Sequence, residues 1–137
     1  HILLIGRGLS FVSAKEAALK IKEISYIHAE AFGGGEIKHG PIALVEEGTP
    51  CIVFVDKESK EEILSNAMEL KSRGGFIIGV SSKNSEVFDI WLKIPENGYA
   101  NCITQIIPMQ LLAYELAVLR GFDPDKPRNL AKSVTVK

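Results

Sequence analysis

The chain has 137 residues, 46% of them hydrophobic, which suits a single domain that can bury a core. With 16 basic and 17 acidic residues its formal net charge is -1, which excludes the broad positive field that attracts nucleic acid or anionic membranes. No apolar run approaches the roughly 18 residues that span a bilayer, and the first residues, HILLIGRG, lack the order of a signal peptide, so we expect a cytoplasmic protein.

The first residues predict a strand followed by a helix. His1 leads without an initiating Met into the apolar run 2–5, so we expect a fragment of a longer chain that starts in a buried strand. The sequence Gly-Arg-Gly at 6–8 is typical of a turn into a helix. Ser13, followed three residues later by Glu16, predicts a capping box that opens this helix, which would run to about Tyr26.

The middle of the chain predicts a loop and then a second strand and helix. Residues 28–41 contain the glycine run 33–35 and end in a proline, which indicates an irregular loop with room for a turn or two of helix. Residues 51–56, CIVFVD, are typical of a buried strand. Ser59 and Glu62 predict the cap of a helix that ends near Arg73.

The last third of the chain predicts two strands, a helix and a tail. Apolar and alternating patterns favour strands at 76–81 and 91–95. Residues 108–121 predict a long apolar helix with Pro108 in its first turn and a glycine as its stop. Two prolines follow, so we divide the chain into a domain of residues 1–121 and a carboxyl-terminal tail of residues 122–137.

This alternation of strands and helices predicts right-handed crossovers and an α/β fold, a three-layer sandwich whose mainly parallel sheet is flanked by helices. In such sheets ligands bind beyond the carboxyl ends of the strands. Segments 6–8, 56–59 and 81–85 follow predicted strands and should lie there. The hydroxyls and amides of residues 80–86 fit a phosphate cradle and a plain turn equally well.

The cysteines and histidines show no pattern of a metal site. Cys51 and Cys102 are far apart and match no ligand spacing, so we expect two reduced thiols in the core. His1, His28 and His39 are not linked by a ligand pattern either. We therefore expect neither a metal nor a cofactor.

Three charged residues share one stripe of the first predicted helix. Glu16, Lys20 and Glu23 are spaced by four and seven, within an arc of roughly 60°. One interpretation is a capping residue and a solvated ion pair. The other follows from the apolar residues that cover most of the remaining circumference, because a narrow charged stripe on such a helix suggests ionisable groups that face an enclosed space.

Two further residues have both a surface and a chemical interpretation. His39 lies in a glycine-rich loop, where it is either an exposed residue or an acid–base group that titrates near neutrality. Lys132 lies in the tail, where a lysine is normally solvated and mobile. The same tail contains apolar residues, so it could dock instead, and a docked lysine can attack a carbonyl.

The segments KEAALKIKEISYIHAEAFGGGEIKHGPIALV and DPDKPRNLAKSVTVK resemble the carboxyl-terminal sugar isomerase (SIS) domain of the glucosamine-6-phosphate synthases, also called isomerizing glutamine:fructose-6-phosphate aminotransferases. The resemblance spans nearly the whole chain. Its KHGP motif is shared widely among phosphosugar isomerases, whereas NLAKSVTV is much more specific. The resemblance implies conversion of fructose 6-phosphate and glutamine-derived ammonia to glucosamine 6-phosphate in a homodimer.

The resemblance also implies roles for the candidate residues. Glu23 would be the base that moves a proton between the first two carbons of the sugar. His39 would assist ring opening from the neighbouring subunit, and Lys132 would form a Schiff base with the ketose carbonyl. The remaining residues that it implies to line the pocket are Glu16, Lys20 and, through its backbone, Ala131.

The resemblance further implies parts of the enzyme that this chain does not contain. Neither the glutaminase domain nor the preceding SIS domain, whose loop binds the sugar phosphate, has a counterpart here. At the equivalent point residues 57–62, KESKEE, are acidic and should repel phosphate, so we expect the isolated chain to be inactive. Two alternatives remain: a phosphosugar deaminase or aldose–ketose isomerase, and a non-catalytic module that senses sugar phosphates.

Overall fold

The computed structural model describes residues 1–130. This part of the chain forms one five-stranded sheet in the order β2-β1-β3-β4-β5, and every neighbouring pair of strands is parallel. The strands are β1 (Ile2–Gly6), β2 (Ala29–Gly33), β3 (Pro50–Phe54), β4 (Phe76–Ser81) and β5 (Ile90–Lys93). The α-helices are α1 (Gly8–Ser25), α2 (Lys60–Lys71) and α3 (Asn101–Leu119). Short 3₁₀ turns are η1 (Ile37–His39), η2 (Pro41–Leu44) and η3 (Gly98–Ala100).

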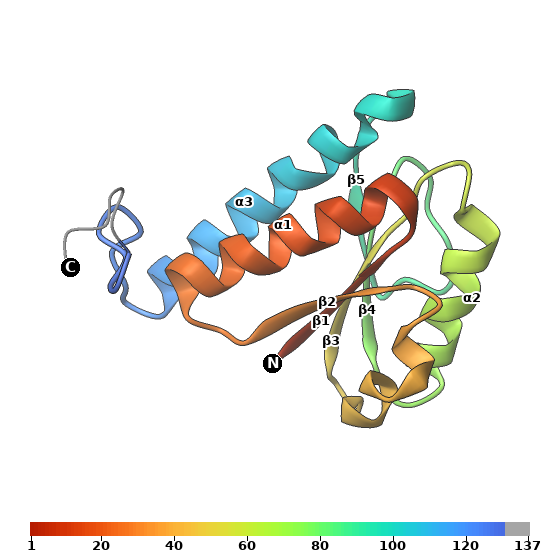
Figure 1. The fold of residues 1–137 in the computed structure, drawn as a ribbon, viewed down its shortest axis with the longest axis horizontal. Helices are drawn as coiled ribbons and strands as arrows, with labels where there is room; N and C mark the ends of the chain where they lie inside the picture. Colours follow the sequence, from red (N-terminus) through yellow and green to blue (C-terminus); the bar gives the residue numbers. More distant parts are fainter. Residues whose placement is uncertain (131–137) are drawn as a thin grey trace, which may run out of the picture.

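The helices cover the two faces of this sheet. Helices α1 and α3 lie side by side on one face, and α2 lies on the other (Figure 1). Because successive strand residues point to opposite faces, the sheet builds a separate core on each. Leu4 and Ile52 pack with Ile21 and Met109 under α1 and α3, and the alternating residues of the same strands pack under α2. The predicted α/β three-layer fold is confirmed.

Helix α1 begins earlier than the capping box predicted. It starts at Gly8, which has a φ of 51°, and no side chain caps it. Ser13 is buried inside the helix, where its hydroxyl donates to the carbonyl oxygen of Cys102 at 3.1 Å. The prediction of Ser13 as the cap and Glu16 as its partner was therefore wrong, because a polar residue that holds two helices together resembles a cap in sequence.

Two further boundaries differ from prediction. Residues 29–33, expected in an irregular loop, form the edge strand β2, which pairs with β1 along its whole length. Turns η1 and η2 in the rest of that segment match the expected turn or two of helix. Helix α3 begins at Asn101, so Pro108 lies inside it rather than in its first turn.

Residues 98–119 have the length and the apolar character of a membrane-crossing helix. Their buried side chains, which include Met109, Ala113 and Ala117, pack in the domain core. The other side of α3 carries large exposed apolar residues. Helix α3 is thus one layer of the domain with a second, uncovered apolar side.

Candidate active site

The charged stripe of α1 forms a contiguous ionic cluster. The ammonium group of Lys20 lies 2.6 Å from Oε2 of Glu23 and 3.5 Å from Oε1 of Glu16. The hydrogen bond to Glu23 is the largest cause that raises the pKa of Lys20, and the two carboxylate charges add to it. Two carboxylates thus share one ammonium, which leaves the cluster with an excess negative charge.

This cluster is open to solvent in the chain on its own. The exposed fractions of the side chains are 43% for Glu16, 31% for Lys20 and 27% for Glu23. Glu16 lines a groove of about 370 Å³ between α1 and α3, and the other two residues lie outside that groove. Residues 1–130 therefore do not enclose the cluster as expected, and the enclosed space stays a prediction for the complete site.

His39 lies on the other side of the sheet from this cluster. It ends η1, whose Ile37 is buried in the core under α2, whereas α1 packs on the opposite face. The side chain of His39 is exposed. The fold therefore separates His39 from Glu23 within one chain.

The start of the tail docks at the carboxyl-terminal end of α1. The backbone amide of Arg128 donates to the Tyr26 hydroxyl at 2.8 Å, and the Arg128 guanidinium lies 4.0 Å from the centre of the Tyr26 ring. Phe122 packs edge-on against Tyr26, with ring centres 4.7 Å apart. Tyr26 follows Glu23 by three residues, so the tail starts beside the charged stripe. Ala131 and Lys132 lie outside the described residues.

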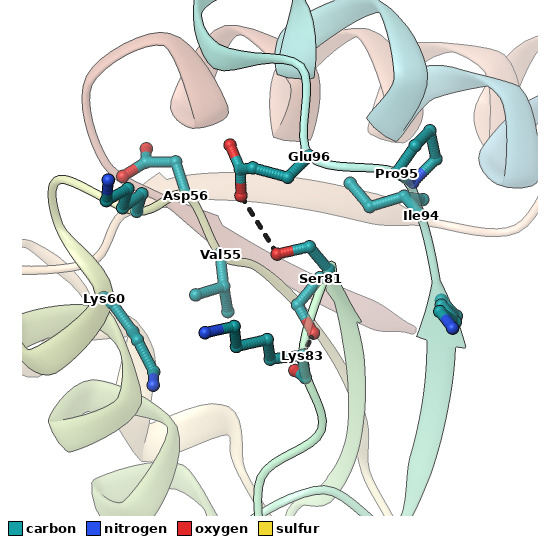
Figure 2. A pocket seen from close by; sticks show the side chains of 11 residues that line it. Val55, Asp56, Lys60, Ser81, Lys83, Ile94, Pro95 and Glu96 are labelled. Atoms are coloured by element: carbon teal, nitrogen blue, oxygen red, sulfur yellow. Dashed lines mark hydrogen bonds between the residues drawn. The ribbon is translucent and has the colours of Figure 1, made fainter.

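A larger cavity lies at the carboxyl ends of the central strands. It has a volume of about 450 Å³ and lies between the ends of β3, β4 and β5 and the start of α2 (Figure 2). The predicted strand-end segments 56–59 and 81–85 both contribute to its lining. Four lysines line it: Lys57, Lys60, Lys83 and Lys93. Sequence reasoning missed this cluster, because its members meet only once the strand order is known.

The segment KESKEE contributes its lysines to this cavity. Lys57 and Lys60 line it, whereas Glu61 and Glu62, in the first turn of α2, do not, and Glu58 lines a smaller cavity that adjoins it. The acidic composition of the segment is thus a poor guide to the charge that a ligand would meet. The cavity lining also contains the carboxylates of Asp56 and Glu96, and the expected repulsion of phosphate stays a prediction.

The two cysteines differ from each other. Cys51 is fully buried in β3, and burial raises the pKa of its thiol to about 11. Cys102 is only half-buried, and its thiol donates to the carbonyl oxygen of Tyr99 at 3.4 Å. The prediction of a core thiol is confirmed for Cys51 and wrong for Cys102.

The sequence is similar to those of known enzymes over nearly the whole chain. The chain is 54% identical over 138 residues to the isomerizing glutamine–fructose-6-phosphate aminotransferase of Thermococcus kodakarensis, a match that covers 97% of this chain and 23% of the relative. It is 46% identical over 143 residues to the enzyme of that name from Xylella fastidiosa, with 100% and 24% covered. The chain thus spans about a quarter of the length of the curated relatives it matches.

Solved structures have the same fold. The C-terminal domain of glucosamine-fructose-6-phosphate aminotransferase from Francisella tularensis has a TM-score of 0.85 and 40% identity, with 93% of this chain and 38% of that chain covered. Glucosamine-6-phosphate deaminase from Thermotoga maritima has a TM-score of 0.80 and 32% identity, with 98% and 40% covered. The sequence profile of the SIS domain matches residues 1–120. The chain therefore belongs to the SIS domain family.

Proposed function

We propose that the chain is the isomerase domain of an isomerizing glutamine–fructose-6-phosphate aminotransferase, with fructose 6-phosphate and glutamine-derived ammonia as substrates and glucosamine 6-phosphate as product. The relatives of that name, at up to 54% identity, supply the reaction. The observation that carries the site is the docking of the tail on Tyr26, beside the Lys20–Glu23 ion pair. Lys132 follows Arg128 by four positions, a length of chain that spans up to about 14 Å.

The proposed chemistry assigns one step to Lys132 and another to Glu23. Lys132 condenses with the ketose carbonyl with loss of water, and ammonia then replaces the lysine nitrogen. Glu23 takes a proton from the first carbon of the sugar and returns it to the second, while the hydroxyl proton on the first carbon passes to the imine nitrogen, which turns the imine of the ketose into an amino aldose. Lys20, beside Glu23, favours the ionised carboxylate that this step needs.

A second copy of the chain supplies the remaining group in this proposal. His39 assists ring opening, yet it lies on the face of the sheet opposite α1. One chain cannot present both groups to one sugar unless the sugar spans the sheet. We therefore infer a homodimer in which His39 of one subunit serves the Glu23 of the other.

The rest of the full-length enzyme encloses the cluster in this proposal. An exposed apolar stripe runs along α3 next to the groove that Glu16 lines. The stripe consists of Ile103, Ile107, Leu111, Tyr114 and Val118. Contiguous apolar surface of this kind marks a protein contact, and the relatives have about three quarters of their length outside the match. A preceding sugar-isomerase domain that covers this stripe would exclude water from Glu23. In this proposal the full-length enzyme is cytoplasmic.

The test uses the full-length protein. Purified enzyme is incubated with fructose 6-phosphate and glutamine, and glucosamine 6-phosphate is measured. Glu23→Gln should lower turnover by about 10²- to 10⁴-fold without loss of folding, because a positioned acid–base group contributes that much. Glu46→Gln, at an exposed glutamate of a loop, is the matched control. Near-normal turnover in Glu23→Gln would favour the sensing module instead.

A phosphosugar deaminase is the second candidate, since the Thermotoga maritima protein of that name shares 32% identity and the fold. A deaminase would release ammonia from glucosamine 6-phosphate and would not consume glutamine. Measuring whether glutamate appears together with the amino sugar separates the two reactions. Ammonia release without any use of glutamine would replace the aminotransferase proposal.

A further inference from the structure

The side chain of Arg7 connects the helices on the two faces of the sheet. Arg7 is the residue before α1, and its backbone is extended, with a φ of -127° and a ψ of 154°. Its guanidinium donates from Nε and Nη2 to Oδ1 of Asn66, at 3.3 Å and 3.1 Å. Asn66 lies on α2, on the other face of the sheet from α1, and is only 4% exposed. Arg7 therefore ties the start of α1 to α2.

The loop after β2 passes close to this pair of side chains. A Cβ atom on Gly34 would lie 2.7 Å from Oδ1 of Asn66 and 3.2 Å from Nε of Arg7. It would also lie 2.8 Å from Cδ1 of Ile63. The backbone of Gly34 is not left-handed, so the close approach of these side chains, rather than a turn conformation, requires glycine here. The Gly34 amide also donates to the Gly6 carbonyl oxygen at 2.9 Å, which holds the loop against the end of β1.

Two backbone hydrogen bonds connect this loop to His39. The Glu36 amide donates to the Gly33 carbonyl oxygen at 2.8 Å, and the His39 amide donates to the Glu36 carbonyl oxygen at 3.0 Å. Between them Ile37 is fully buried and packs in the core under α2, to which Ile63 also belongs. Residues 33–39 therefore run next to α2 as a short, hydrogen-bonded unit (Figure 1). The position of His39 depends on how the glycines at the start of this unit are held.

Arg7 is held by an uncharged partner. Within residues 1–130 its guanidinium has no carboxylate within 4.0 Å. Both of its side-chain hydrogen bonds in this part of the chain go to the amide oxygen of Asn66. An arginine that only balanced charge would face a carboxylate, whereas the planar guanidinium here fixes a direction. The pair thus provides geometry rather than neutralisation of charge.

We propose that Arg7 and Asn66 are positioning residues for His39. They hold the glycines of the loop in place, and the hydrogen-bonded unit 33–39 then presents the exposed side chain of His39 at a fixed place on the surface. This inference rests on the proposed function, in which His39 assists opening of the sugar ring. It adds two residues that do not contact the sugar and that act only through His39.

The first test is a double-mutant cycle in the full-length protein, with turnover of fructose 6-phosphate and glutamine as the readout. Arg7→Met and Asn66→Leu should each lower turnover about ten- to a hundredfold, because displacing a catalytic group by about 1 Å has an effect of that size. In a His39→Asn background neither change should lower turnover further, since both act through the same side chain. A merely structural role would lower turnover by the same factor in both backgrounds, and that result overturns the proposal.

Two further variants and a control complete this test. Asn66→Asp keeps an acceptor oxygen for Arg7 and should retain turnover near that of the wild type. Gly34→Ala forces the loop away from the intact pair and should lower turnover as Arg7→Met does, so it replaces Arg7→Met if that variant fails to fold. Arg73→Met, at an exposed arginine after α2, is the control and should change nothing. Normal turnover in Gly34→Ala, or a loss in folded Asn66→Asp as large as in Asn66→Leu, overturns the proposal.

Hydrogen exchange separates this inference from the proposed function. In Arg7→Met and Asn66→Leu the amides of residues 34–39 should exchange about tenfold faster, as loss of one charge-assisted hydrogen bond predicts, whereas those of α3 should not change. If the wild type is active but the exchange of residues 34–39 stays unchanged in both folded variants, the positioning role fails while the aminotransferase remains. If the wild type makes no glucosamine 6-phosphate, the proposed function fails and the positioning role falls with it, although faster exchange would still show that the pair holds the loop.

Discussion

Lys20 donates a 2.6 Å hydrogen bond to Glu23, one turn further along α1, and this bond is the main reason that the pKa of Lys20 is raised. Lys20 therefore stays charged throughout the physiological pH range. In the full-length enzyme, Lys20→Met should lower kcat about ten- to a hundredfold, which is the worth of one hydrogen bond to a charged group. Steady-state kinetics measure this, with Lys22→Met as the control at an exposed position of α1. An unchanged kcat with a raised KM would assign Lys20 to binding alone.

Gly79 in β4 has no room for a side chain. A Cβ atom at this position would overlap the ring of Phe88, which covers the strand. Gly79→Ala should therefore destabilise the chain by about 1–3 kcal/mol, the usual cost of an overpacked site. Gly33→Ala in the edge strand β2 is the control, because its Cβ would meet only the side chain of Glu36, at 3.4 Å from Cγ and 3.9 Å from Cβ. Urea denaturation compares the two, and equal stability would show that Phe88 moves aside freely.

The sequence predicted the fold class where the local pattern and the tertiary environment agreed. Strands β3 and β4 are continuous apolar runs because both faces of the sheet are covered. Strand β2, with the sequence AEAFG, contains few residues that favour strands, so its pairing with β1 decides its structure. Pro108 indicated a helix start, yet packing of α3 against α1 extends the helix through it.

The candidate site also contains contacts that the local sequence predicts and contacts that depend on the tertiary fold. Glu16, Lys20 and Glu23 are neighbours through helix geometry alone, so their contact could be predicted from spacing. Their exposure could not, because it depends on what covers α1. Lys60 and Lys83 lie on segments that meet only through the pairing of β3 with β4. The spacing of residues along the sequence does not predict such a pairing of strands.

Asp89 should make the stability of the chain depend on acidic pH. It accepts from the Ile77 amide at 2.7 Å and from Lys71 at 2.9 Å, and these bonds lower its pKa. Because the pKa of Asp89 in the folded chain lies below the unfolded value of about 3.9, the ionised carboxylate stabilises the fold at pH values above the unfolded pKa. This stabilisation is lost as the pH falls through the folded-state pKa. The stability difference between the wild type and Asp89→Asn, at most about 1 kcal/mol for an exposed pair, should shrink below pH ~4.

Chemical denaturation at a series of pH values measures this difference. Asp125→Asn is the control, since that side chain is exposed and lies in the loop after α3. The Asp89 variant and the wild type should converge in acid, whereas the control should track the wild type at every pH. A constant gap between Asp89→Asn and the wild type would show that the charge of Asp89 is irrelevant.

The two thiols should react at different rates. With its pKa raised to about 11, the Cys51 thiol is about 10⁻⁴ ionised at pH 7, and its side chain is fully buried. Cys102 is half-buried near the start of α3. Iodoacetamide should therefore label Cys102 of the native chain well before Cys51, and both equally in denaturant. Mass spectrometry measures the two sites, and early labelling of Cys51 would mean that β3 opens readily.

The exposed stripe of α3 should matter only when the rest of the enzyme is present. Ile107 and Leu111 are 54% and 61% exposed in this chain, so changing both to serine should alter the stability of the chain alone by only about 0.5 kcal/mol per site. In the full-length enzyme the same change places two hydroxyls in a proposed contact between domains, where an unpaired hydroxyl costs about 1–3 kcal/mol. Turnover should fall there, because water then reaches Glu23.

Met68→Ser separates this effect from a general loss of apolar surface. Met68 is 55% exposed, but it lies on α2, on the opposite face of the sheet. Turnover is measured for both variants in the full-length enzyme, and the hydrogen exchange of α3 is measured in the full-length enzyme and in the chain alone. If the α3 variant and Met68→Ser behave alike in both, the stripe is ordinary surface and the enclosure of Glu23 needs another source. If only the α3 variant loses turnover and protection, the covering domain sits on α3, and the solvent-open cluster seen in this chain is the uncovered half of a closed site.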